Sequence, residues 1–220
     1  MGWKVVGNST YPDKCLVIAA PHTSNWDFLI GRCYAYIIGV VPKYLIKSEL
    51  YFWPLSILIR WNGGIPVYRK TAKNTVDQIV ERLKTADNLI LGIAPEGTRK
   101  RVKKWKTGFY HIAQKAEVPI VLMYMDYAKK EVGFLDVLYP SGDLQKDMQI
   151  IQSYYKDLIG KNPELFNSKI YYYSSSGIIS SIKFRSYYKK INSTIGFAIE
   201  NLGYILKSYT TYQTPLPLQY

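Results

Sequence analysis

Short apolar runs alternate with amphipathic stretches along most of this chain, and that alternation limits the folds open to it. Cys15–Ala20, Asn88–Ala94 and Val118–Tyr124 have the length and composition of buried strands. Between such runs, Asp27–Ile38 and Thr75–Thr85 carry apolar residues at helical spacing. Strands and helices that alternate in this way predict an α/β domain, in which helices flank a largely parallel sheet.

The same patterns predict the remaining elements. Further short strands are expected at Val5–Val6, Tyr44–Ile46 and Ile65–Tyr68. Further helices are expected at Leu50–Trp61, Phe109–Ala116 and Gln145–Ile159. The helix at 50–61 contains Pro54, which suits only its first turn, since proline interrupts the interior of a helix.

Beyond residue 167 the composition changes. Residues 168–220 contain one acidic residue, Glu200, and are rich in Tyr, Ser and Ile, with poor helical or strand periodicity. We therefore expect one domain over 1–167, followed by a weakly structured tail over 168–220. Two other interpretations stay open for this tail: a segment that adheres to membranes, since Tyr and Lys suit interfaces, and a stretch that is not native to the chain.

The charge balance points to an anionic partner. The formal net charge is +13 at pH 7, which suits nucleic acid, an anionic membrane surface or phosphorylated substrates. Nucleic-acid platforms interleave aromatic with basic residues, whereas the basic residues here cluster at 99–106, so no nucleic acid is expected. Cys15 and Cys33 form neither a CxxC pair nor a disulfide framework, which favours a reducing compartment and argues against a cysteine-ligated metal.

The sequence predicts no membrane span and no secretory signal. No stretch reaches the roughly 18 uninterrupted apolar residues that a spanning helix needs. If the protein meets a membrane, we expect it to lie on the surface. Six aromatic residues are candidates for an apolar rim, although at least half are expected in the core: Trp3, Tyr51, Phe52, Trp53, Trp61 and Trp105.

One of the two histidines, His22, directly follows the strand that ends at Ala20, and Asp27 lies five residues further on. Residues five apart do not share a helix face, so the pair meets only if His22 lies in the corner and Asp27 in the first helical turn. An aspartate on one imidazole nitrogen fixes the tautomer and leaves the other nitrogen to act as a base. Alternatively, Ser24-x-x-Asp27 matches a capping box, and Asp27 merely caps the helix.

Two further strand ends carry unusual polar residues. In GGIPVYRK (63–70), Gly64 permits close backbone approach and Arg69 offers a bidentate fork for phosphate. In APEGTRKR (94–101), Glu96 needs a partner if it is buried, and Arg69, Arg99 or a substrate hydroxyl would serve. Each segment taken alone also fits an ordinary solvated turn. Ligands of parallel sheets gather at the carboxyl ends of strands, and three such ends coincide with these motifs.

Together these segments resemble one family. HTSNWD (22–27), GGIPVYR (63–69), PEGTR (95–99) and VPIV (118–121) are similar, in order and spacing, to the four boxes of the glycerolipid acyltransferases. The resemblance covers about residues 3–167 and is nearest to short bacterial 1-acylglycerol-3-phosphate acyltransferase-like proteins. It implies the glycerol-3-phosphate acyltransferase-like fold. It also implies acyl transfer from acyl-CoA or acyl carrier protein to a lysophospholipid hydroxyl, giving phosphatidic acid in phospholipid biosynthesis, without metal or cofactor.

The resemblance also implies residue roles. His22 is the expected general base and Asp27 orients it. Substrate binding is implied for Gly64, Arg69, Glu96, Gly97, Thr98 and Arg99. Of these, the two arginines are expected on the acceptor phosphate, and a backbone amide near Gly97 on the tetrahedral oxyanion. The second histidine, His111, lies within a predicted helix and is interpreted as structural.

The chain departs from the family pattern at two positions. Pro21 precedes His22 where the family often has Asn, and Lys100 follows Arg99 where it often has Ser. The chain also starts almost at its first strand, so we expect no anchoring helices ahead of the first box. Acylation of a different lyso-lipid, thioester hydrolysis and a non-enzymatic role as a peripheral anionic-lipid-binding module stay open. The expected location is cytoplasmic, peripheral on the inner face of the cell membrane.

Overall fold

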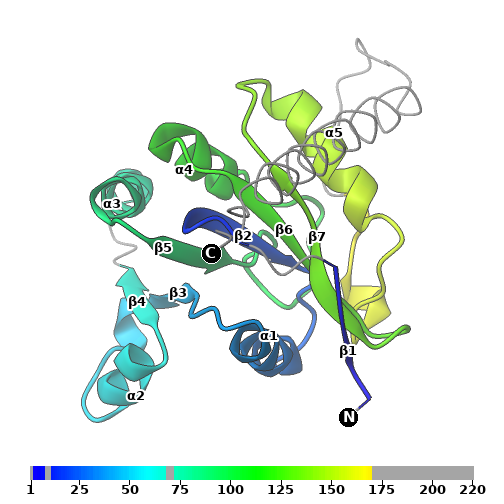
Figure 1. Ribbon diagram of the computed structural model, residues 1–220, viewed down its shortest axis with the longest axis horizontal. Helices are drawn as coiled ribbons and strands as arrows, with labels where there is room; N and C mark the ends of the chain where they lie inside the picture. Colours follow the sequence, from blue (N-terminus) through cyan, green and yellow to red (C-terminus); the bar gives the residue numbers. More distant parts are fainter. Residues whose placement is uncertain (1, 8–10, 68–71, 170–220) are drawn as a thin grey trace, which may run out of the picture. The chain divides into compact units, whose positions relative to one another are not determined.

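The computed structural model of the chain describes residues 2–7, 11–67 and 72–169 (Figure 1). They belong to one compact unit, Met1–Tyr173, built around a seven-stranded sheet in the order β1-β7-β6-β2-β5-β3-β4. The strands are β1 (Lys4–Val6), β2 (Lys14–Ala20), β3 (Lys43–Lys47), β4 (Gly64–Val67), β5 (Leu89–Ile93), β6 (Ile120–Asp126) and β7 (Glu131–Leu138). The helices are α1 (Trp26–Ile37), α2 (Leu55–Trp61), α3 (Ala72–Thr85), α4 (Gly108–Ala116) and α5 (Leu144–Tyr155). Except for residues 168 and 169, the predicted tail lies outside the described residues, and its nature stays a prediction.

The sheet is largely parallel, so the predicted α/β class is confirmed. β2 pairs in parallel with β5 and with β6, and β3 pairs in parallel with β4 and β5. β7 pairs with β6 in antiparallel and with β1 in parallel, so these two strands run against the other five. The carboxyl ends of β2, β5 and β6 therefore meet at one edge of the sheet, with β2 in the middle.

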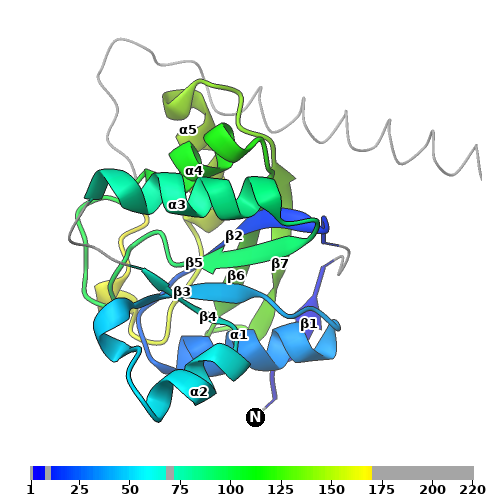
Figure 2. The same ribbon diagram turned by 90° about the vertical axis from the view of Figure 1, so that its left-hand side faces the viewer.

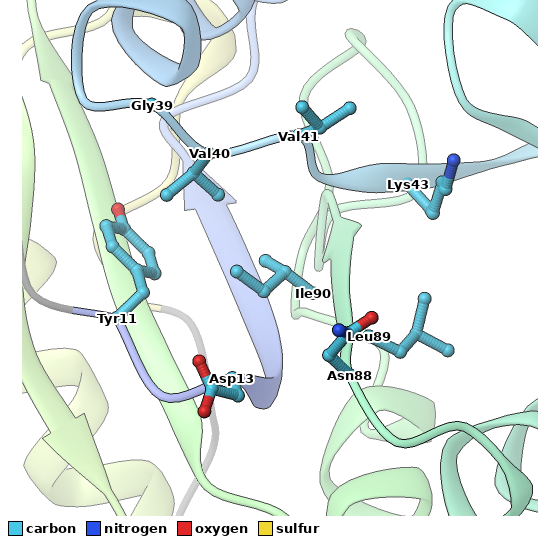
Figure 3. A pocket seen from close by; sticks show the side chains of 9 residues that line it. All are labelled: Tyr11, Asp13, Gly39, Val40, Val41, Lys43, Asn88, Leu89 and Ile90. Atoms are coloured by element: carbon cyan, nitrogen blue, oxygen red, sulfur yellow. The ribbon is translucent and has the colours of Figure 1, made fainter.

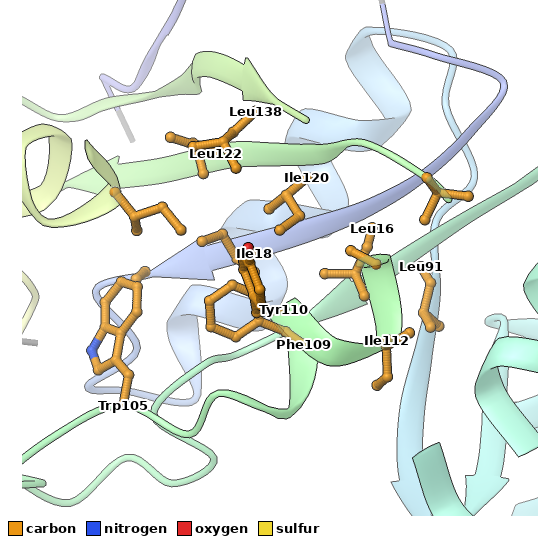
Figure 4. Close-up of a cluster of buried hydrophobic side chains, with 14 of the residues drawn as sticks. Leu16, Ile18, Leu91, Trp105, Phe109, Tyr110, Ile112, Ile120, Leu122 and Leu138 are labelled. Carbon is orange, nitrogen blue, oxygen red and sulfur yellow. The ribbon is translucent and has the colours of Figure 1, made fainter. Parts of the chain in front are cut away.

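Helices cover both faces of the sheet, as Figure 2 shows: α3, α4 and α5 on one face, and α1 and α2 on the other. The alternation of β2 explains both layers, because successive strand residues point to opposite faces. Leu16 and Ile18 enter the larger apolar cluster, where Figure 4 shows them beside Phe109 and Tyr110 of α4. Cys15 and the other intervening residues of β2 enter the smaller cluster beneath α1.

Three elements differ most from those predicted. β7 was not predicted, because its mostly half-buried residues give neither an apolar run nor a strict alternation. α2 begins at Leu55 and not at Leu50, since Ser48–Leu50 forms a separate 3₁₀ turn and Pro54 precedes the helix. α5 ends at Tyr155, four residues before the expected end, where the chain turns back toward the carboxyl edge of β2. Within the described residues, no helix combines the length and the apolar character needed to cross a bilayer.

Candidate active site

The corners after β2 and β5 are joined by one carboxylate. β2 and β5 are parallel neighbours, with Ile18 opposite Ile93, so the residues that follow them emerge side by side. The backbone N–H of His22 donates to both carboxylate oxygens of Glu96, at 3.0 Å to Oε1 and 3.1 Å to Oε2. The two segments that the sequence analysis singled out at these strand ends are therefore in direct contact.

His22 and Asp27 meet in the geometry that the sequence analysis required. His22 lies in the corner, Asp27 lies in the first turn of α1, and Nδ1 of His22 is 3.2 Å from Oδ2 of Asp27. The same Oδ2 accepts the backbone N–H groups of Thr23 at 2.7 Å and Ser24 at 2.8 Å. Asp27 thus holds the histidine ring and also accepts two backbone N–H groups that lie ahead of α1. The capping box expected at Ser24 is not formed, because the cap residue of α1 is Asn25 and no side chain makes a capping hydrogen bond there.

A further contact to Asp27 was not predicted. The hydroxyl of Tyr127 donates to Oδ1 of Asp27 at 2.6 Å. Tyr127 directly follows β6, whose Tyr124 pairs with Ala20 of β2, so the residues after these two strands lie close together. The rule that strand ends meet at one edge points to this position, but the chain has 21 tyrosines and nothing in its local sequence marks this one.

The two carboxyl groups of the site are buried, and their pKa values are pushed in opposite directions. Asp27 is 1% exposed, and burial alone raises its pKa, but hydrogen bonds from His22, Tyr127 and Ser24 hold that pKa below its usual value. Glu96 is 4% exposed, and burial raises its pKa to about 7, because the His22 amide offsets only part of the effect. Asp27 is therefore ionised at neutral pH, beside a histidine side chain that is 22% exposed.

A late segment of the chain, residues 160–162, contacts the corner after β2. The side-chain amide of Asn162 donates to the carbonyl of Thr23 at 2.8 Å, and its backbone N–H donates to the Thr23 hydroxyl at 3.2 Å. At Gly160, an added Cβ would lie 2.8 Å from the Thr23 hydroxyl oxygen and 3.1 Å from Cβ of Pro21, so glycine permits this approach. We call residues 160–162 the closing segment. No role was predicted for this segment.

The structure gives Glu96 and Gly64 structural contacts. Glu96 is bound by the His22 amide, whereas we expected Arg69, Arg99 or a substrate hydroxyl as its partner. Arg99 is exposed, and Arg69 lies outside the described residues. Gly64 packs under α2, where an added Cβ would overlap Cγ2 of Ile59. The implied contacts of these residues with substrate stay predictions.

The turn after Glu96 is exposed and basic. Gly97 has a φ of +68°, and Thr98 and Arg99 follow it at the surface. The N–H of Gly97 donates to the carbonyl of Ala94 at 3.0 Å, so this particular amide is already engaged. The expected role of an amide near Gly97 at the oxyanion stays a prediction. The Lys106 side chain lies over Gly97, with Nζ 2.9 Å from the position of an added Cβ, and places a cation next to the turn.

The expectation that at least half of the six aromatic candidates lie in the core is wrong, because only one of the six is buried. Trp105 is 2% exposed, Trp3 and Tyr51 are half-buried, and Phe52, Trp53 and Trp61 are 56%, 80% and 85% exposed. His111 is exposed on α4 and packs edge-on against Tyr110, away from the β2 corner. Among the residues that the structure describes, no group of three His, Cys, Asp or Glu side chains is placed to hold a metal ion.

A hollow of about 390 Å³ lies elsewhere, at the opposite edge of the sheet (Figure 3). Its walls come from the chain before β2, the chain after α1, and the starts of β3 and β5, and include Tyr11, Val40 and Ile90. The hollow is therefore separate from the His22 corner.

Comparison with known proteins identifies the family. The Acyltransferase family model matches residues 3–126, which is more than half of the chain. The chain belongs to the acyltransferase family. The matched range contains every residue for which the resemblance implied a role, from His22 to Arg99. It stops one residue before Tyr127 and does not reach the closing segment.

Several known acyltransferases are similar to this family member. A 1-acyl-sn-glycerol-3-phosphate acyltransferase of Saccharomyces cerevisiae is 29% identical over 126 residues, covering 54% of this chain and 41% of the yeast protein. The human 1-acyl-sn-glycerol-3-phosphate acyltransferase alpha is 30% identical over 141 residues, covering 56% and 46%. The matches thus span less than half the length of these relatives.

The acyltransferase fold is also found in a solved structure. The crystal structure of the 1-acyl-sn-glycerophosphate (LPA) acyltransferase PlsC of Thermotoga maritima matches with a TM-score of 0.50 and 20% identity. The match covers 68% of this chain and 67% of that protein. The predicted acyltransferase-like fold is confirmed.

Proposed function

We propose that this protein transfers a fatty acyl group from an acyl thioester to the free hydroxyl of a lysophospholipid. The acceptor proposed first is 1-acylglycerol-3-phosphate, which would give phosphatidic acid. One observation carries the proposal: Nδ1 of His22 lies 3.2 Å from Oδ2 of the buried Asp27, at the carboxyl edge of the sheet. The names of the yeast, human and Thermotoga relatives support the choice of acceptor.

The chemistry follows from the orientation of the ring. With a proton on Nδ1 toward Asp27, Nε2 of His22 has a free lone pair and takes the proton of the acceptor hydroxyl. The acceptor oxygen then bonds to the thioester carbonyl carbon and forms a tetrahedral intermediate. The intermediate collapses by breaking the C–S bond, and the departing thiolate takes the proton back from His22. The negative charge of Asp27 stabilises the transient imidazolium.

The basic turn supports an anionic acceptor. Exposed cations follow Glu96 directly: Arg99, Lys100, Arg101, Lys103, Lys104 and Lys106. Arginine binds phosphate in a bidentate manner, and we assign acceptor phosphate to Arg99 and Arg69, with Gly64, Glu96, Gly97 and Thr98 shaping the site. The donor is acyl-CoA or acyl carrier protein, and the proposed reaction needs no cofactor or metal.

We also propose that the protein lies in the cytoplasm, on the inner face of the cell membrane. Large apolar side chains are exposed on and beside the two helices of one face, namely Trp26, Phe28, Leu29, Tyr36, Ile37, Phe52, Trp53, Ile57, Leu58 and Trp61. Between residues 28 and 76 the sequence has seven Lys or Arg residues against one acidic residue, Glu49. Aromatic side chains beside cations suit an anionic bilayer surface. Flotation with anionic vesicles should recover the wild type and lose Trp53→Ser/Trp61→Ser, and wild-type protein that never floats would refute this location.

The activity is tested with labelled palmitoyl-CoA and 1-acylglycerol-3-phosphate, with palmitoyl-acyl carrier protein and other lyso-lipids as further arms. Wild type should form phosphatidic acid, and His22→Ala should lower kcat by about 10³-fold, since a general base contributes on the order of 10²–10⁴. His111→Ala, which removes the other histidine, should leave the rate unchanged.

Two outcomes would count against the proposal. Release of free CoA and fatty acid without acylated lipid would identify a thioesterase. Silence with every donor and acceptor, in folded protein, would refute acyl transfer and favour a lipid-binding role. A truncation after Asn167 that keeps the activity would show that residues 168–220 are dispensable for it.

A further inference from the structure

The two carboxylate oxygens of Asp27 have different partners. Oδ2 is shared by Nδ1 of His22 and the amides of Thr23 and Ser24, which all belong to the same corner. Oδ1 accepts the hydroxyl of Tyr127, a residue 100 positions later in the chain. The orientation of the carboxylate is therefore fixed from two sides, and the far side depends on one phenol.

Tyr127 is itself held in place by two other segments. Its backbone N–H donates to the carbonyl of Ile159 at 2.9 Å, directly before the closing segment. Its ring packs edge-on against Trp3, with the ring centroids 4.9 Å apart. Burial and the neighbouring Asp27 raise the pKa of the phenol above its usual value, so the hydroxyl keeps its proton and acts as a donor. Neither contact involves β2 or α1.

We propose that Tyr127 is a positioning residue for the proposed acyl transfer: its hydroxyl holds Oδ1 of Asp27, so that Oδ2 stays against Nδ1 of His22. This inference rests on the proposed function. Without the phenol, Oδ1 is a buried acceptor that has lost its donor, and the carboxylate turns to recover one. The Nδ1–H form of His22, which presents a free Nε2 to the acceptor hydroxyl, then loses its fixed partner.

The chain contains a matched control outside the site. The hydroxyl of Tyr110 donates to Oδ2 of Asp147 at 2.8 Å, and Asp147 is 2% exposed. Tyr110→Phe therefore also removes a tyrosine–aspartate hydrogen bond, here between α4 and α5, with no histidine hydrogen-bonded to the aspartate. A loss shared by Tyr110→Phe and Tyr127→Phe would reflect stability alone.

The first experiment is steady-state kinetics of the full chain with palmitoyl-CoA and 1-acylglycerol-3-phosphate, well below the melting temperature of each variant. We expect Tyr127→Phe to lower kcat about tenfold, equivalent to about 1.4 kcal/mol, with the acceptor KM within twofold of wild type. Tyr110→Phe should keep the wild-type kcat. In an Asp27→Asn background, Tyr127→Phe should cost nothing further, because its effect passes through the carboxylate. An unchanged kcat in Tyr127→Phe, or the same loss with Asn at 27, would overturn the assignment.

A second experiment measures the tautomer of the His22 ring and does not depend on enzymatic activity. Because the chain has two histidines, ¹⁵N imidazole spectra of wild type and His111→Gln assign His22. We expect the Nδ1–H tautomer of His22 in wild type and Tyr110→Phe, and a mixture of tautomers in Tyr127→Phe. An unchanged tautomer in Tyr127→Phe would overturn the positioning role. If wild type shows no acyl transfer, the proposed function fails while this spectrum still decides the role of Tyr127.

Discussion

Two buried aspartates of this protein are built almost alike, yet only one belongs to a candidate active site. Asp27 and Asp147 are 1% and 2% exposed, and each lies near the start of a helix. Each accepts one tyrosine hydroxyl and at least one backbone N–H, from Tyr127, Thr23 and Ser24 at Asp27, and from Tyr110 and Ser141 at Asp147. Burial and full hydrogen bonding are thus common to both.

The difference lies in the remaining side-chain partner of each carboxylate. Asp147 is completed by the hydroxyl of Ser141 at 2.9 Å, a group that never changes its charge at ordinary pH. Asp27 is completed by His22, which can take up a proton and whose side chain is 22% exposed. A buried carboxylate with all its hydrogen bonds made is therefore ordinary protein structure, whereas catalysis also needs a titratable neighbour that substrate can reach.

The largest expected effect separates these two aspartates directly. Asp27→Asn should lower kcat by about 10³-fold, because the amide no longer fixes the His22 tautomer or stabilises its charged form. Asp147→Asn should keep kcat within twofold at low temperature but lower the free energy of unfolding by about 2–3 kcal/mol, since donors at Ser141 and Tyr110 lose a charged acceptor. Acyl-transfer kinetics and urea unfolding measure the two quantities. Equal losses of kcat in both variants would contradict the assignment of Asp27, and not Asp147, to the active site.

A smaller effect tests the carboxyl that joins the two corners, Glu96. Its folded-state pKa of about 7 lies above the ordinary 4.5, so between these values the unfolded chain binds fewer protons than the folded one. Stability from this group is therefore fully present below about pH 4.5 and is lost as pH rises to 7, by about 3 kcal/mol in all.

Glu96→Gln should remove that dependence, because the amide oxygen still accepts the His22 N–H but does not ionise. Thermal unfolding of wild type and Glu96→Gln between pH 5 and 8 measures the difference. Glu81→Gln, at an exposed position on α3, serves as the control and should follow wild type. A Glu96→Gln curve parallel to that of wild type would show that Glu96 ionises as freely in the folded chain as in the unfolded one.

The smallest expected effect concerns the closing segment. Gly160→Ala places a methyl group 2.8 Å from the Thr23 hydroxyl oxygen, and should lower the free energy of unfolding by about 1–2 kcal/mol with a few-fold fall in kcat. Gly108→Ala is the control, because an added Cβ there meets nothing within 4 Å. It should be neutral, or stabilising by up to about 1 kcal/mol. Identical unfolding curves for the two variants would show that the closing segment accommodates the added methyl group without a loss of stability.

Much of the fold follows from local patterns, because the central strands are buried on both faces. Cys15–Ala20 and Val118–Tyr124 are continuous apolar runs, and they form β2 and β6 within one or two residues at each end. β7 escaped prediction because half-buried residues leave no periodic signal. The end of α5 was also missed, because the turn back toward β2 is set by contacts with residues more than a hundred positions away.

The site shows the same limit. The meeting of His22 and Asp27 was expected because the resemblance gives the two residues a shared role, whereas their spacing alone left the meeting conditional on the geometry of the corner. The partner of Glu96 and the contact of Tyr127 did not follow, since they depend on β5 and β6 lying on either side of β2. Motifs can be recognised from the spacing of residues along the chain. The order of strands across the sheet cannot, because it depends on how the helices and strands pack in the folded core.

The closing segment also has a consequence for synthesis. A ribosome produces His22 and Asp27 early, but the residues that complete their surroundings follow at 96, 127 and 160–162. A nascent chain that stops short of Asn162 contains His22 and Asp27 but lacks the hydrogen bonds that Asn162 makes to Thr23. The proposed activity should therefore arise late in translation, after residues 160–162 have left the exit tunnel.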